Sequence, residues 1–121
     1  MEDIINRGGG NILIRVYNSL PDESIDREGD VTIHVDGETK VVPAGTQVRL
    51  EPGMSLTITQ RMYHDFEVEP GTGAVLIGEV SQCNDDNTDN RFNPPAGRFP
   101  EIEEDEPPYR LLCNEYPAAV E

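Results

Sequence analysis

The chain has 121 residues, a length typical of one domain with its own hydrophobic core. Nine Lys and Arg against 24 Asp and Glu give a net charge of −15, which argues against nucleic-acid and membrane partners because phosphates and anionic lipids carry the same sign. No apolar run approaches the ~18 residues that a membrane span needs, and no signal segment is visible. Cys83 and Cys113 are too few for a disulfide framework or a zinc set. We therefore expect a cytoplasmic protein with reduced thiols.

The chain begins with an entry segment, residues 1–10, in which the triplet Gly8-Gly9-Gly10 predicts a tight or irregular backbone and a close-packed turn. Apolar and polar residues then alternate with a period of two, which predicts strands at 11–18, 31–35, 38–42, 46–50, 55–59, 64–68 and 74–80. Residues 19–30 read as an exposed loop, and Gly or Pro pairs separate the later strands. Short strands with turns about every 8–12 residues predict an all-β sandwich or barrel.

The character of the sequence changes after residue 80. Residues 81–110 are acidic and rich in proline, a composition that is also typical of disordered tails. Large apolar residues are embedded in or just after it: Phe92, Phe99, Ile102, Tyr109, Leu111 and Leu112. They favour a long segment packed across the mouth of a barrel, and we expect residues 1–121 to form a single domain.

His64 is the most informative single residue. It shares a strand face with Phe66 and Val68, which predicts that this face is buried and that the imidazole points inward. A buried imidazole needs either a hydrogen-bond partner or a metal, and the strand pattern alone leaves both open. His34 lies on the opposite face from Val31, Ile33 and Val35, so we expect it to face solvent and have no role in a site.

The spacing around His64 resembles the second motif of the cupin superfamily, in which a glycine precedes the metal-binding histidine. Gly53 and His64 are separated by ten residues, although Thr59 and Arg61 stand where the motif has proline and glycine. Glu2 and Gly9 have the spacing that ends the first cupin motif. The resemblance implies a jelly-roll β-barrel in which Glu2 and His64 bind a divalent metal. Two further ligands, from a His-x-His pair, would lie before residue 1.

Longer blocks resemble one cupin family, the D-lyxose isomerases; they are residues 2–11, 78–81, 84–92, 98–108 and 111–116. The resemblance implies an aldose-ketose isomerase that interconverts D-lyxose and D-xylulose. It also implies a divalent cofactor, which we expect to be Mn, with Fe, Zn or Co as alternatives. We expect a homodimer, because the edge strands of a partial barrel tend to pair. The sequence resembles the carboxy-terminal metal half of such an enzyme.

The implied reaction moves a proton between C1 and C2 of the open-chain sugar through an enediolate, so it needs a carboxylate base. Crowding among the acidic residues near position 103 favours Glu103, and Glu79 on the 74–80 strand is the alternative. Asp86 and Arg91 offer the acceptors and donors that suit vicinal hydroxyls. The same residues also fit a solvated acidic run and ordinary Asx turns.

A second reading of the sequence is not enzymatic. A chain that contributes only Glu2 and His64 to a metal site can be a catalytically inactive or truncated cupin domain. It would then act as a sugar-binding or subunit-interaction module.

Overall fold

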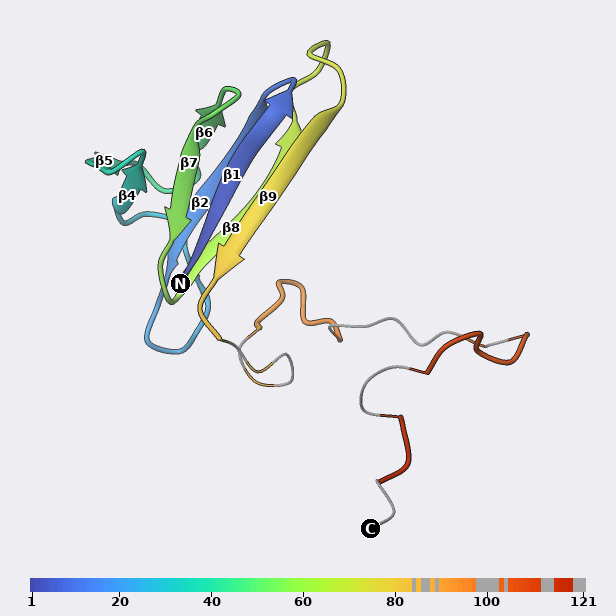
Figure 1. Cartoon of the computed structure of the whole chain (residues 1–121). Helices are drawn as coiled ribbons and strands as arrows, with labels where there is room; N and C mark the ends of the chain where they lie inside the picture. The colour runs from blue at the N-terminus through green and yellow to red at the C-terminus, as the bar shows by residue number, and fades with distance from the viewer. Residues whose placement is uncertain are drawn as a thin grey trace. The chain divides into compact units, whose positions relative to one another are not determined.

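The structure is a computed structural model that describes residues 1–83, 85, 88, 90–97, 103, 105–111 and 115–118. Within these residues the chain is all-β, with nine strands and no helix (Figure 1). The strands are β1 Glu2–Gly9, β2 Ile12–Ser19, β3 Ile25–Asp26, β4 Val31–Val35, β5 Glu38–Val42, β6 Gln47–Leu50, β7 Ser55–Ile58, β8 Met62–Val68 and β9 Val75–Ser81. The predicted all-β class is confirmed.

The nine strands form two sheets in which every pairing is antiparallel. The first sheet has the order β5-β4-β7-β1-β9. In the second sheet β2 pairs with both β6 and β8, and the short β3 pairs with the end of β2. This arrangement agrees with a cupin-type barrel or sandwich, and it leaves β8 and β9 with one strand partner each in the described part of the chain.

The core lies between the two sheets and is built from alternate residues of their strands. The buried apolar side chains are Ile4, Ile12, Ile14, Val16, Val31, Ile33, Val35, Leu50, Leu56, Ile58 and Met62. The period-two pattern of β2 and β4 predicts their share of this set, and each buried branched side chain contributes about 1.5–3 kcal/mol of transfer free energy. Hydrophobic burial in the strands therefore supplies the main force that holds the two sheets together.

The entry segment is not predicted as a strand, yet residues 2–9 form the long strand β1. β1 pairs with β7 and β9, with a register shift between Asn6 and Gly8. The expected turn at the glycines is present: Gly9 has a φ of 93°, and a Cβ there would lie 2.1 Å from the Ala74 carbonyl oxygen. The close approach of the β1 end to Ala74 therefore requires glycine.

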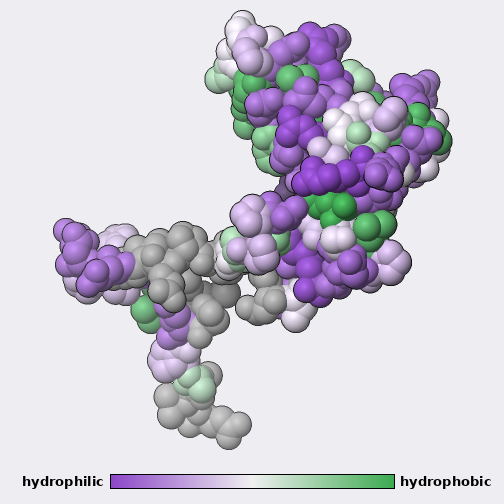
Figure 2. Space-filling view, turned by 180° about the vertical axis from the view of Figure 1, so that it is seen from behind, coloured by the Kyte–Doolittle hydropathy of each residue, from purple (hydrophilic) through white to green (hydrophobic). Residues whose placement is uncertain are grey.

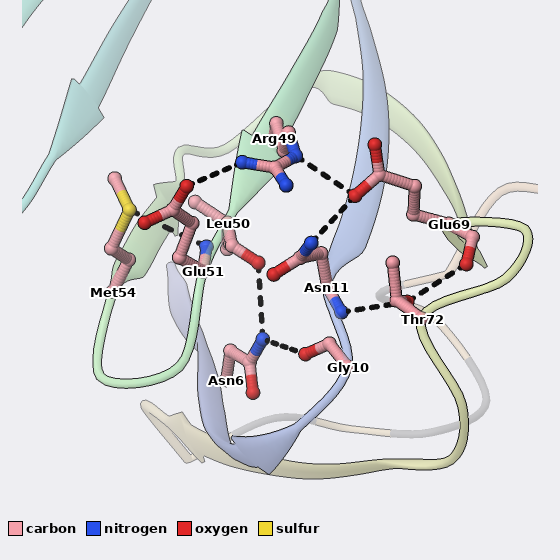
Figure 3. A network of polar contacts seen from close by, with 9 residues as sticks. All are labelled: Asn6, Gly10, Asn11, Arg49, Leu50, Glu51, Met54, Glu69 and Thr72. Atoms are coloured by element: carbon pink, nitrogen blue, oxygen red, sulfur yellow. Dashed lines mark hydrogen bonds and ion pairs between the residues drawn. The ribbon is translucent and has the colours of Figure 1, made fainter.

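Asn6 is the only polar residue with a fully buried side chain among the residues described, and it joins three segments (Figure 3). Its Nδ2 donates to the carbonyl oxygens of Gly10 at 2.9 Å and Leu50 at 3.0 Å. Its Oδ1 accepts from the Gly8 N–H at 3.0 Å. One amide thus satisfies three backbone groups where β1 turns into β2 and β6 ends.

A second part of the network in Figure 3 is ionic and lies at the surface. Glu69 Oε2 accepts from Asn11 Nδ2 at 2.6 Å and from Arg49 Nε at 2.8 Å, and Arg49 also contacts Glu51. The hydrogen bonds from Arg49 and then Asn11 lower the pKa of Glu69 below its ordinary value of 4.5. The network ties the end of β6 to the start of β2 and to the turn after β8.

Residues 85–121 form a second compact unit, distinct from the unit of residues 1–84. Its described residues adopt turns and bends rather than strands. The expectations that residues 81–110 pack on the barrel and that the chain is one domain stay predictions. Seen from behind, the molecular surface is mostly hydrophilic, with apolar residues in small patches (Figure 2). No helix in the described ranges has the length and apolar character needed to cross a membrane.

We expect Asn6→Ala to lower the free energy of unfolding by about 1–3 kcal/mol, because the carbonyls of Gly10 and Leu50 and the Gly8 N–H would lose their buried partner. Urea denaturation monitored by circular dichroism measures the change. Asn18→Ala is the control, since it removes one exposed hydrogen bond to the Asp30 carbonyl and should cost less than about 1 kcal/mol. Equal losses for the two variants would contradict the assigned role of Asn6.

We expect Glu69→Gln to reduce stability near neutral pH and to have no effect in strong acid. Because folding lowers the pKa of Glu69, the ionised carboxylate stabilises the folded chain at pH values above 4.5, which is the ordinary pKa of the group. This contribution is lost as the pH falls through the lowered pKa of the folded state. Urea titrations over a pH series should show the two chains converging. Glu67→Gln, which removes an acceptor of the neutral Gln47 amide, is the control, and a difference that is constant with pH would contradict the prediction.

Candidate metal centre

Glu2 and His64 come together although 61 residues separate them in the sequence. Glu2 begins β1 in the first sheet and His64 lies near the start of β8 in the second. The distance from His64 Nε2 to Glu2 Oε1 is 3.4 Å, and the side chains are 25% and 29% exposed. An imidazole nitrogen and a carboxylate oxygen therefore meet between the sheets, at a place that solvent still reaches.

The strand register explains why His64 points inward. In β2, Ile12, Ile14 and Val16 are fully buried, and Val16 is the direct partner of His64. Residues that pair directly in an antiparallel sheet point to the same side. His64 therefore has the inward orientation that its strand pattern predicts.

The expectation that this whole face of β8 is buried is wrong. Phe66 and Val68 share the inward side with His64, since they pair with Ile14 and Ile12, but they are 49% and 43% exposed. The alternation of β8 gives the direction of these side chains correctly. Their exposure follows from the position of β8 at the edge of its sheet, where no described strand covers them.

The stretch from Gly53 to His64, which contains β7 and the turns on either side of it, has the glycine-to-histidine spacing of the cupin motif. Gly53 has a φ of 96°, and Arg61 has a φ of 68° although it is not a glycine. Arg61 stands where the motif has its inner glycine, and it adopts a left-handed conformation that favours glycine. The Arg61 guanidinium donates to Ser19 Oγ at 3.2 Å and to the Leu20 carbonyl at 2.8 Å. These bonds stabilise the turn that precedes β8, the strand in which His64 lies.

Two inward positions of β9 lie beside the Glu2–His64 pair. Glu2 pairs directly with Ser81, and Ile4 pairs with Glu79. Because Ile4 is buried, Glu79 points to the interior side, and its exposure reflects the open edge of β9. Glu79 is thus an accessible carboxylate one inward position away from Glu2 along the β1–β9 pair.

The other predicted site residues belong to the second unit, residues 85–121. Glu103 and Arg91 are exposed residues of the second unit, and Asp86 lies outside the described residues. Their roles stay predictions. His34 lies on the outer face, as expected, with Nδ1 3.0 Å from Thr39 Oγ1.

The donor chemistry of the Glu2–His64 pair suits a divalent metal, because neutral imidazole and carboxylate are ordinary ligands of Mn, Fe and Zn. The pair supplies one nitrogen and one oxygen. Among the described residues, no group of three or more His, Cys, Asp or Glu is arranged to hold a metal. The two side chains therefore fit as part of a metal site rather than as a complete one.

Comparison with known proteins decides the family. The profile of the family described as D-lyxose isomerase matches residues 1–116. The chain belongs to the D-lyxose isomerase family. It is 50% identical over 115 residues to a D-lyxose/D-mannose isomerase of Serratia proteamaculans and 47% identical over 115 residues to one of Escherichia coli O157:H7. Each match covers 95% of this chain and 50% of the relative, so the chain spans about half the length of these family members.

Sequence reasoning misses one inner-face residue next to the Glu2–His64 pair. Ser81 lies directly opposite Glu2. The strand pattern predicts that Phe66 shares the face of His64, but it does not predict the exposure of Phe66. The strand patterns show which residues share a face, but they do not show that β9 pairs with β1 or that β8 is an edge strand.

We expect the Glu2–His64 contact to contribute less than about 1 kcal/mol to folding, since both side chains are partly exposed. A double-mutant cycle with Glu2→Ala and His64→Ala, measured by urea unfolding without added metal, gives the coupling free energy. A coupling of several kcal/mol would instead assign these residues a structural role. His34→Ala serves as a histidine control on the outer face of the barrel.

Proposed function

We propose that this chain forms part of a metal-dependent aldose-ketose isomerase that interconverts D-lyxose and D-xylulose. The single observation that carries the proposal is the Glu2–His64 contact, found in a member of the D-lyxose isomerase family. The names of the two relatives support the same substrate class and add D-mannose. D-Mannose has the configuration of D-lyxose at C2, C3 and C4, so one site can accept both sugars.

Glu2 and His64 would supply two of the ligands of the divalent metal, for which we propose Mn, with Fe, Zn or Co as alternatives. When bound, such an ion polarises the sugar carbonyl and stabilises the developing enediolate charge. β1 pairs with β7 and β9, and β8 pairs with β2, so hydrogen bonds fix the backbones of both residues and bring their side chains together before a metal binds. The partial exposure of both side chains leaves them accessible to an ion and a sugar.

A carboxylate must take the proton from one sugar carbon and return it to the next. Glu79 has the structural support for this role: its backbone is fixed by β1, it points to the interior side, and it lies next to the Glu2–Ser81 pair. Glu103 remains the other candidate base, on the strength of the acidic cluster around it. We propose that Asp86 and Arg91 bind sugar hydroxyls, through carboxylate acceptors and guanidinium donors.

A non-catalytic role is the second candidate, because a single observation favours it. The described residues bring together two metal ligands rather than three or four. A chain that acts alone with two ligands would be a sugar-binding or subunit-interaction module. We further propose a homodimer, because the edge strands of a partial barrel tend to pair, and a cytoplasmic location, in line with the small number of cysteines.

We expect this chain to bind Mn²⁺ weakly through the Glu2–His64 pair. Electron paramagnetic resonance of free Mn²⁺, titrated with the chain, measures the bound fraction. His64→Ala should lower the affinity by about 10-fold or more, because it removes one of two ligands. His34→Ala should leave the affinity unchanged, since His34 lies on the outer face. Equal effects of the two substitutions would remove the metal role from His64.

We expect isomerase activity when the chain is extended upstream by a segment that carries His-x-His. Ketose formation from D-lyxose and D-mannose in the presence of Mn²⁺ is the measurement. Glu2→Gln or His64→Ala should each lower kcat/KM by about 100-fold or more, which corresponds to the several kcal/mol that a Lewis acid supplies. Glu79→Gln and Glu103→Gln, tested in parallel, identify the base as the one whose loss costs about 100- to 10,000-fold. No ketose from the extended chain would reject the isomerase proposal.

A further inference from the structure

A hydroxyl lies next to the proposed metal ligands at the end of β9. Ser81 is the last residue of β9 and the direct partner of Glu2, and Figure 1 shows the end of β9 beside the start of β1. Gln82 N–H donates to the Met1 carbonyl at 3.1 Å. Because hydrogen-bonded and non-hydrogen-bonded pairs alternate, Glu2 and Ser81 form a non-hydrogen-bonded pair. The side chains of such pairs are the closer kind, with Cβ atoms about 4.5–5.5 Å apart.

Ser81 points to the interior side of its sheet. Directly opposite residues of an antiparallel pair project to the same side, and Glu2 projects toward His64 of the other sheet. Ser81 is also exposed, so a small molecule can reach its hydroxyl from solvent. Of the inward residues of β1, β8 and β9, three strands that the structure describes in full, Ser81 is the one with a hydroxyl.

A carboxylate shares this face of β9. Glu79 lies two residues before Ser81, which places the two side chains on the same side of the strand, roughly 7 Å apart along it. Glu2 stands opposite Ser81 on the neighbouring strand. Ser81 is therefore flanked by a proposed metal ligand and by a candidate base. A sugar bound between these two carboxylates would lie against the Ser81 hydroxyl.

The proposed isomerisation transfers two protons of the sugar. The base removes the proton from C2 of the aldose, the C1–C2 double bond forms, and O1 takes the negative charge of the enediolate. The ketose carries its hydroxyl on C1 and its carbonyl on C2, so the hydroxyl proton must pass from O2 to O1 before the base returns its proton to C1. A group that accepts one proton while it donates another can make this second transfer.

We propose that Ser81 is a further catalytic residue, which relays the proton from O2 to O1 of the enediolate; this inference rests on the proposed isomerase function. The Ser81 oxygen accepts the O2 proton while its own proton passes to O1, so the hydroxyl is restored and carries no charge. The electrons of the O2 anion then form the C2 carbonyl, and those of the C1–C2 double bond take the proton from the base at C1. A hydroxyl suits this relay because it both donates and accepts, whereas an ionised carboxylate only accepts.

The test follows two reactions of D-lyxose in D₂O with Mn²⁺, using the chain extended upstream by a segment that carries His-x-His. Proton nuclear magnetic resonance measures, in one sample, the exchange of the C2 proton for deuterium and the formation of ketose. We expect Ser81→Ala to slow ketose formation by about 100-fold, as for the loss of a proton-transfer group, while C2 exchange continues. Exchange continues because the enediolate still forms and the base still returns a deuteron to C2.

Two variants and one binding measurement distinguish a relay from a structural role. Ser81→Thr keeps the hydroxyl and should restore most of the rate of ketose formation. Ser55→Ala is the matched control, because it removes a hydroxyl that bonds Asp36 on the outer side of the first sheet, and it should change neither reaction. The Mn²⁺ affinity of the 121-residue chain, measured by electron paramagnetic resonance, should be the same with and without Ser81→Ala.

An equal fall in C2 exchange and ketose formation in Ser81→Ala overturns the relay, since it indicates a structural role. So does an unchanged rate of ketose formation in Ser81→Ala, a loss of Mn²⁺ affinity, or a Ser81→Thr variant as slow as Ser81→Ala. In each of these cases the original extended chain still forms ketose, so the isomerase proposal stands. Absence of both reactions from the original extended chain instead rejects the isomerase proposal, and the relay with it.

Discussion

The position of β1 between two hydrogen-bonded neighbours is the constraint on which the candidate site depends. Bonds to β7 on one side and β9 on the other fix the twist and register of β1, and the alternation of side chains then sends Glu2, Ile4 and Asn6 to the interior. Ile4 joins the apolar core, and the Asn6 amide holds the far end of the strand. Glu2 is thereby aimed toward His64 by the backbone rather than by the weak contact between the two side chains.

Much of the barrel could be predicted from the sequence because one face of most strands is buried. The alternation in β2 and β4 predicts their positions and their inward residues correctly. It does so because Ile and Val residues occupy every second position and are buried on one side of each strand. The strand β1 could not be predicted in this way. Its inward face mixes Glu2, Ile4 and Asn6, so polar residues at both ends hide the period, and the glycines after it indicate a turn without revealing a strand.

The candidate site, like the barrel, could be predicted from the sequence only in part. The inward direction of His64 follows from local alternation, and its pairing with Glu2 was expected only because the spacing resembles a known motif. No local pattern shows that β9 pairs with β1, so the proximity of Glu79 and Ser81 to Glu2 depends on long-range strand order. Exposure is likewise a property of neighbours: Phe66 and Val68 have a core-type pattern, yet they are half exposed because β8 is an edge strand.

The proposed metal ligand His64 and the edge position of β8 are related through the backbone of that strand. The backbone groups of His64 point to the open edge of β8, so a strand added there places alternate side chains about 4.5–5.5 Å from the β8 side chains, measured between Cβ atoms. Two histidines separated by one residue point to the same face of a strand, because the side-chain period is two. A His-x-His segment in that strand can therefore present both imidazoles toward the interior, next to His64 and Glu2. The same strand would also contact Phe66 and Val68, which lie on the same side of β8 as His64.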